Sequence, residues 1–128
     1  MKEDKLTLSV LQGKLAVCRL EKFSPIPDWV VEEDFFSITK TDDELSIVCY
    51  EECVPKNIKS EKGWRAFKVE GPLDFTQTGI LASLANPLAE AGISIFAMST
   101  FDTDYLLVKE HDLDESVKIL KEFCNINK

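Results

Sequence analysis

The sequence predicts an α+β protein made of two interlocked ferredoxin-like βαββαβ units, the first with reduced helices. Three observations lead to this prediction. The second half has the order strand, helix, two strands, helix; the first half has strand patterns with space for only one helical turn; and a hairpin pattern recurs 60 residues further on. With 128 residues, 45% of them hydrophobic, the chain can build a real core. We expect the halves to span residues 1–60 and 61–128.

The first half is predicted to consist mainly of short strands. The stretch "LTLSVLQGKLAVCRL" alternates and is interrupted at Gln12 and Gly13, which indicates two strands around a turn. Pro25 and Pro27 stiffen the next loop, and Asp28 is expected to cap one helical turn. The segments "FFSITK" and "ELSIVCY" then predict a hairpin, and the polar "ECVPKNIKSEKG" predicts a joint between the halves.

The second half opens with a strand, "WRAFKVE", and a loop, "GPLDFTQT". A helix is predicted from about Gly79 to Ala91, ended by Gly92 and bent by Pro87, whose ring removes a backbone donor. Its predicted buried stripe consists of Leu81, Leu84, Leu88 and Ala91.

The segments "ISIFAMS" and "YLLVKE" are the next predicted strands, and a final helix follows them. Asp112 and Glu115 resemble a capping box at its start. The predicted apolar stripe is Leu113, Val117, Leu120 and Cys124. Only "NINK" follows, so this unit is predicted to lack its last strand. We expect the N-terminal strand Leu6 to Leu11 to take that place and interlock the halves.

An internal repeat links the two halves. A shift of 60 residues places Phe36–Val48 on Phe96–Val108 without a gap, with Phe36, Asp42 and Val48 identical and Glu44 matching Asp104 in charge. Two amphipathic hairpins share part of such a pattern by chance, so the repeat supports duplication only in part. It raises the prospect of a pseudo-symmetric interface that brings acidic turns together.

Composition excludes several classes of function. The formal net charge is −8 and only Arg19 and Arg65 are arginines, which argues against nucleic-acid binding because phosphate contacts require clustered cations. No apolar run approaches the ~20 residues that cross a bilayer, and the charged "MKEDK" is not followed by a signal-peptide segment. We therefore expect a cytoplasmic protein without a membrane partner.

The four cysteines are expected to be free, mostly buried thiols, since the chain looks able to fold without disulfides. Cys49 and Cys53 lack a second pair at zinc-site spacing, and His111 is the single histidine. We therefore expect neither a metal site nor a cofactor.

The stretch "FAMSTFDTDYLLV" places polar residues between two apolar runs. A plain β-turn explains this pattern, and so does a polar binding rim. The loop before the predicted helix favours the binding-rim interpretation, because free backbone N–H groups at Thr78, Gly79 and Ile80 favour binding of an anion. In a βαββαβ unit this loop lies near the end of the second strand, so an N–H cradle beside a carboxylate would suit a zwitterion. By the repeat alignment Asp102 falls at the tip, whereas Asp104 is expected to point toward the cradle.

The stretch from "EGPLDFTQTGILASL" to "STFDTDYLLVKE" closely resembles the second half of small bacterial tandem ACT-domain proteins, and "ITKTDDELSIVCYEECVP" resembles their first half. The same subtype is similar to modules of the animal cytosolic arginine sensor. ACT domains are ferredoxin-like regulatory modules that bind amino acids at interfaces between domains. The resemblance implies ligand contacts at Asp74, Gln77, Gly79, Ile80, Thr100, Phe101 and Asp104. Gln77 falls where the arginine sensor is expected to carry an acidic residue.

The function predicted from these features is a non-catalytic regulatory module that binds an amino acid and forms a possible homodimer. One alternative is a protein-interaction module with a vestigial site. Another is a small ferredoxin-like hydrolase, which needs a cationic oxyanion partner and a poised base. Arg19 and Arg65 lie outside both loops, and the sequence shows no Ser–His or Cys–His arrangement beside His111, so this alternative is disfavoured.

Overall fold

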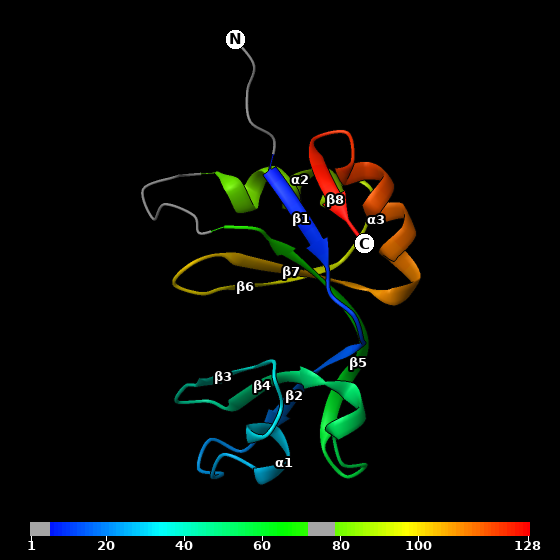
Figure 1. The fold of residues 1–128 in the computed structure, drawn as a ribbon. Coiled ribbons are helices and arrows are strands. Elements are labelled where there is room, and N and C mark those ends of the chain that lie inside the picture. The colour runs from blue at the N-terminus through cyan, green and yellow to red at the C-terminus, as the bar shows by residue number, and fades with distance from the viewer. Residues whose placement is uncertain (1–5, 72–78) are drawn as a thin grey trace. The chain divides into compact units, whose positions relative to one another are not determined.

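The structure is a computed structural model that describes residues 6–71 and 79–128 (Figure 1). The chain forms two compact units. The smaller unit consists of residues 13–64, and the larger unit combines residues 1–12 with residues 65–128. The predicted α+β, ferredoxin-like architecture is confirmed, while the division into halves at residues 60 and 61 stays a prediction.

The smaller unit is mostly a sheet. Its elements are β2 (Leu15–Leu20), α1 (Asp28–Val31), β3 (Phe36–Lys40), β4 (Leu45–Tyr50), the 3-10 turn η1 (Glu51–Cys53) and the first part of β5 (Lys59–Val69). β4 pairs antiparallel with β2 and β3, and β2 also pairs antiparallel with β5. Its core contains Ala16, Cys18, Val30, Leu45, Ile47 and Cys49. The single short helix confirms that this half has reduced helices.

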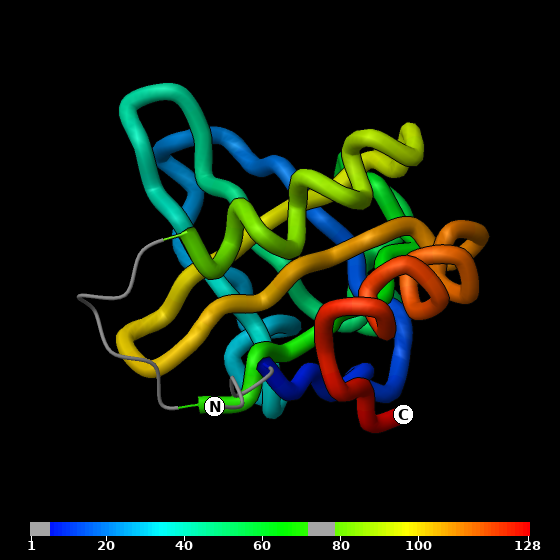
Figure 2. The backbone as a smooth tube through the Cα atoms, turned by 90° about the horizontal axis from the view of Figure 1, so that it is seen from above, coloured from blue at the N-terminus to red at the C-terminus, as the bar shows by residue number. Residues whose placement is uncertain are grey.

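The larger unit is a five-stranded sheet with two helices. Its elements are β1 (Leu6–Val10), the second part of β5, α2 (Ile80–Glu90), β6 (Ile95–Ser99), β7 (Asp104–Lys109), the 3-10 turn η2 (Glu110–Asp112), α3 (Leu113–Leu120) and β8 (Cys124–Asn127). The strand order is β8-β1-β5-β7-β6. Figures 1 and 2 show α2 and α3 on the same face of this sheet. Phe67, Val69, Leu84, Leu106 and Leu120 are buried between the sheet and these helices.

The chain ends of the larger unit lie side by side in the sheet. β1 pairs antiparallel with β5, with Leu8 opposite Val69, and parallel with β8, with Leu6 opposite Cys124. The expectation that no strand follows the last helix was therefore wrong, as was the placement of Cys124 on the helix stripe. The tail was missed because it is short and because Asn and Lys are poor strand formers, so that pairing with β1 decides its conformation.

Strand β5 is longer than predicted. It runs from Lys59 to Val69, and its first residues belong to the polar stretch that the sequence analysis assigned to a joint. Arg19 of β2 lies opposite Lys59, so backbone pairing with β2 extends the strand through residues whose side chains do not favour it.

Helix α2 confirms the predicted segment. It begins after Gly79 (φ 77°) and is followed by Gly92 (φ 80°), and both φ values lie in the left-handed region that glycine tolerates. Leu84 and Leu88 are buried, and Pro87 is accommodated without ending the helix.

Two predicted caps are wrong. Asp112 is the N-cap residue of α3 but makes no side-chain cap bond, and Ser116 Oγ instead donates to the Asp112 carbonyl at 2.7 Å. Asp28 is the first residue of α1 rather than its cap, because Pro27 occupies the N-cap position.

The hairpins β3–β4 and β6–β7 are equivalent at an offset of 59 residues rather than 60. Lys40 lies opposite Leu45, and Ser99 lies opposite Asp104, so both turns contain four residues and corresponding positions differ by 59. Buried residues agree with this offset, since 47–49 correspond to 106–108. The ungapped alignment at 60 was wrong because it matched residue types, whereas strand pairing sets the register. Asp104 therefore corresponds to Leu45, and Glu44 corresponds to Thr103.

Candidate functional site

Three segments of the larger unit meet at one end of its sheet. β5 reaches its carboxyl end there, α2 begins there, and the turn between β6 and β7 lies there (Figures 1 and 2). The βαββ topology produces this arrangement, because the first strand and the first strand of the following hairpin run in the same direction.

The turn at residues 100–103 is held by hydroxyl groups. The Thr100 N–H donates to the Thr103 carbonyl at 2.8 Å, and the Thr103 N–H donates to Thr100 Oγ1 at 3.2 Å. Thr103 is buried, and its Oγ1 donates to the carbonyl of Val69 in β5. The polar residues of this stretch therefore close a turn, as the plain alternative predicted, and they also fasten that turn to the neighbouring strand.

Consecutive residues of β7 face opposite sides of the sheet. Leu106 and Val108 are buried in the core with the α2 residue Leu84, so Asp104 belongs to the helix-covered face. Its Oδ1 accepts a hydrogen bond from Ser99 Oγ at 2.6 Å. Tyr105 belongs to the opposite face.

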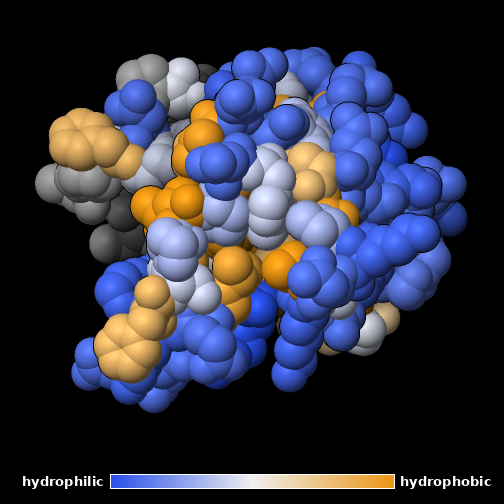
Figure 3. Space-filling view, turned by 90° about the horizontal axis from the view of Figure 1, so that it is seen from below, coloured by the Kyte–Doolittle hydropathy of each residue, from blue (hydrophilic) through white to orange (hydrophobic). Residues whose placement is uncertain are grey.

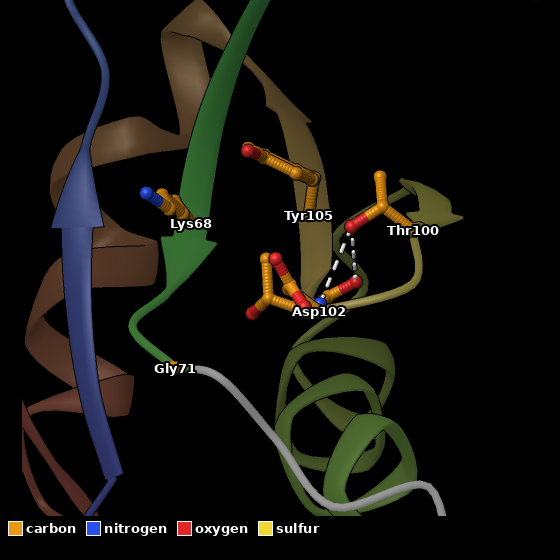
Figure 4. A pocket seen from close by; sticks show the side chains of 6 residues that line it. Lys68, Gly71, Thr100, Asp102 and Tyr105 are labelled. Atoms are coloured by element: carbon orange, nitrogen blue, oxygen red, sulfur yellow. Dashed lines mark hydrogen bonds between the residues drawn. The ribbon is translucent and has the colours of Figure 1, made fainter.

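A pocket with a volume of about 240 Å³ lies beside the turn, and Lys68, Gly71, Thr100, Asp102, Thr103 and Tyr105 line it. Lys68 comes from β5, Gly71 from just beyond the end of this strand, Thr100 and Asp102 from the turn, and Tyr105 from β7 (Figure 4). Lys68 lies between the core residues Phe67 and Val69 in β5, so Lys68 and Tyr105 share the face opposite the helices.

The lining carries both signs of charge. Lys68 contributes an ammonium group, Asp102 a carboxylate, and Thr100 and Tyr105 contribute hydroxyls. The Lys68 ammonium also lies 3.8 Å from the Glu70 carboxylate. Such a lining complements a small molecule that carries a carboxylate and an ammonium group.

The predicted site residues are not all brought together. Thr100 lines the pocket, Phe101 is 79% exposed on the turn, and Asp104 is bonded to Ser99. Gly79 and Ile80 stand at the start of α2, where no side chain caps the helix. Asp74, Gln77 and Thr78 lie outside the described residues.

The conformation of Gly79 affects how it can be tested. A Cβ built there meets no atom within 4 Å, yet its φ of 77° strains any other L-residue. Gly79→Val would consequently disturb folding, so an effect of this variant on binding could not be separated from an effect on folding.

The sequence analysis missed Lys68 and Tyr105, whereas its placement of Asp102 at the tip of the turn agrees with the exposure of that residue. A signal for the first two was present, because successive side chains of a strand face opposite sides, so Lys68 lies out of phase with Phe67 and Val69, and Tyr105 lies out of phase with Leu106 and Val108. The pairing between β5 and β7 brings them onto one face.

The thiols form a separate group in the smaller unit. A hydrogen bond to Cys18, together with burial, raises the pKa of Cys49, and the same bond is the main cause that lowers the pKa of Cys18. Burial is the main cause that raises the pKa of Cys53, whose Sγ donates to the Tyr50 carbonyl at 3.0 Å. Cys18 and Cys49 are buried, as expected, which keeps a substrate away from them.

Other kinds of site are not found in the described part of the chain. Residues 6–71 and 79–128 contain no cluster of His, Cys, Asp and Glu that could hold a metal ion. His111 is exposed in η2, and its Nε2 lies 3.4 Å from Asp112 Oδ2. No helix within these ranges has the length and apolar character needed to span a membrane.

The fold and the charged pocket define a ferredoxin-like module with a small polar site. A sequence model of the ACT domain matches residues 59–122, and the chain belongs to the ACT domain family. A second model, which describes an N-terminal domain, matches residues 13–57.

Relatives support this assignment. The crystal structure of a protein from Agrobacterium tumefaciens is 40% identical, with a TM-score of 0.90, and the match covers 97% of this chain and 93% of that one. The human protein named "Cytosolic arginine sensor for mTORC1 subunit 1" is 34% identical over 77% of this chain. The chain spans about a third of the length of such curated relatives.

A more distant structure shows the fold alone. The regulatory subunit of aspartate kinase from Thermus thermophilus has a TM-score of 0.58 at 10% identity, with 91% of this chain and 95% of that chain covered.

Proposed function

We propose that this protein is a non-catalytic regulatory module that binds an amino acid at the turn end of its larger unit. The observation that carries the proposal is the occurrence of an ammonium group and a carboxylate in one pocket of about 240 Å³ within an ACT-domain protein. An α-amino acid presents the complementary pair of charges.

The chemistry of the described residues supports binding without turnover. The pocket offers hydrogen-bonding and charged groups but no thiol or imidazole in its described lining, and His111 stands in η2 beside Asp112. Acyl and phosphoryl transfer usually need a nucleophile paired with a base. A module without such groups can still regulate, because binding of a free amino acid to one conformation shifts the population of protein conformations.

Relatives support the amino-acid class. Proteins named as arginine sensors match most of this chain, and structures of aspartate kinase regulatory chains share its fold. The proposal also includes the contacts that the resemblance implies, at Asp74, Gln77, Gly79, Ile80, Thr100, Phe101 and Asp104, with Thr78 added by the predicted N–H cradle. Because Asp104 belongs to the helix-covered face, these contacts and the charged groups of the pocket are tested separately. The proposal includes a cytoplasmic location and a possible homodimer as well.

A thermal-shift screen of the twenty amino acids, followed by calorimetry, tests the proposal. A ligand at about 100 times its Kd should stabilise the folded state by about 2.7 kcal/mol and raise the melting temperature. NMR spectra of the ligand should be unchanged after prolonged incubation with the protein. Absence of both a thermal shift and binding heat for all twenty would overturn the proposal and favour a protein-interaction module.

A further inference from the structure

The two strand residues of the pocket, Lys68 and Tyr105, lie on the sheet face opposite α2 and α3, which separates them from the helix-side carboxylate Asp104. Within β5, Phe67 and Val69 are fully buried in the core while Lys68 between them is half-buried. The hydrogen bond from Ser99 to Asp104 occupies part of the Asp104 carboxylate within the hairpin. Asp102 and Lys68 are therefore the two oppositely charged groups that the pocket offers to a ligand.

Asp102 is held by residues on both sides of it in the turn. The Thr100–Thr103 hydrogen bonds close the turn around it, and Thr103 is fastened to Val69 of β5. The backbone at Asp102 is thereby fixed relative to the strand that carries Lys68. A fixed backbone reduces the conformational entropy that the turn loses when a ligand binds, while the Asp102 side chain itself is exposed and accessible to a ligand.

Lys68 already has a weak partner. Its ammonium lies 3.8 Å from Glu70, the two side chains are 37% and 40% exposed, and Ser9 Oγ donates to Glu70 at 2.5 Å. An ion pair at such exposure contributes at most about 1 kcal/mol. A ligand carboxylate can therefore share or replace Glu70, while Ser9 keeps Glu70 in place.

The charges and the volume of the pocket also limit the charge and the size of the ligand. One ammonium and one carboxylate are matched by the two α-groups of an amino acid. Tyr105 adds a hydroxyl to the lining, whereas the hydroxyls of Thr100 and Thr103 already donate to the carbonyls of Thr103 and Val69. The volume of about 240 Å³ lies below the roughly 300 Å³ at which pockets for drug-sized molecules begin. A second charge on the ligand would have no ionic partner among these described lining residues.

We infer that Lys68 and Asp102 hold the α-carboxylate and the α-ammonium of a small amino acid with an uncharged side chain, on the sheet face opposite the helices. This inference rests on the proposed function and assigns its recognition groups. The Tyr105 hydroxyl lies beside the two charges in the lining.

Calorimetry with L-serine as the probe tests the inference, with ethanolamine and glycerate as analogues that lack the carboxylate and the ammonium, respectively. Lys68→Met and Asp102→Asn should each weaken serine binding at least about tenfold, because each leaves one ligand charge unpaired. Both analogues should bind wild-type protein at least about tenfold more weakly than serine. Asp102→Asn should leave glycerate binding unchanged, a result that a loss of folding could not produce.

Matched controls exchange the same groups elsewhere in the larger unit. Lys118→Met and Asp114→Asn change exposed residues of α3 and should bind serine within about twofold of wild type. Circular dichroism and urea unfolding of all variants identify any change in folding.

The remaining outcomes separate the inference from the proposed function. If wild-type protein binds serine or another amino acid and Lys68→Met and Asp102→Asn bind it equally well, the inference is overturned and the function stands. If only Asp104→Asn weakens amino-acid binding, the recognition groups lie on the helix-covered face and the inference is overturned. Binding of arginine but not serine would overturn the assigned ligand class, and no binding of any amino acid would overturn the function itself.

Discussion

Thr103 connects the turn to the central strand of the larger unit. It is 6% exposed, and its Oγ1 donates to the Val69 carbonyl. Thr103→Val keeps the shape of the side chain but leaves that carbonyl without this donor. We expect the free energy of unfolding to fall by about 1–3 kcal/mol, measured by urea denaturation.

Thr39→Val is the control for this change, because Thr39 is an exposed strand residue. Its effect should stay within about 0.5 kcal/mol. Equal stabilities for the two variants would show that the Thr103 hydrogen bond contributes nothing.

The hairpin turns show how one position acquires different chemistry in the two units. Thr41 accepts backbone hydrogen bonds as Thr100 does, so both turns begin with the same hydroxyl capping. The fourth turn residue is Glu44 in one unit and the buried Thr103 in the other. The same turn geometry is consequently fastened to β5 through a side chain in the larger unit.

Helix α2 carries Pro87 within its span, where the missing N–H removes one helical hydrogen bond. Pro87→Ala restores that donor, and alanine is favoured over proline in a helix interior by about 3 kcal/mol. The more flexible unfolded chain offsets about 1 kcal/mol of this gain. We expect a net stabilisation of about 1–2 kcal/mol in urea unfolding.

Asn86→Ala, at the exposed neighbouring position, is the control and should change stability by less than about 0.7 kcal/mol. Destabilisation by Pro87→Ala would mean that packing of the proline ring outweighs the lost hydrogen bond.

The net charge affects the stability of the whole molecule. The formal net charge is −8, and Figure 3 shows a face on which hydrophilic residues surround a minority of apolar ones. Self-repulsion of like charges destabilises a compact state, and salt screens it. Raising the ionic strength from about 0.01 M to about 0.15 M shortens the Debye length from about 30 Å to about 8 Å. The melting temperature should rise by up to about 4 °C, as measured by calorimetry.

Substitutions at two exposed positions change the net charge in opposite directions. Glu52→Lys lowers its magnitude by two and should reduce the salt dependence, whereas Lys56→Glu raises it by two and should increase it. A salt dependence that is the same in both variants would contradict a whole-molecule origin.

Much of the architecture follows from local patterns in the sequence. The short apolar runs in "LSIVCY" and "YLLVKE" specify strands, and the leucine spacing of α2 with its flanking glycines specifies a helix and its ends. Each of these signals depends on neighbouring residues alone. The family resemblance added the ACT fold, and the family match confirms it.

Pairing between distant segments decided the rest. The tail 124–127 is a strand because β1 offers it backbone partners, and β5 begins at Lys59 because β2 pairs with it. The hairpin register corrects the repeat offset to 59, and the pairing of β5 with β7 brings Lys68 and Tyr105 to the pocket beside Asp102. Hydrogen bonds between strands far apart in the chain supply energy that no local pattern encodes, so the tertiary structure alone determined which charged residues share a site.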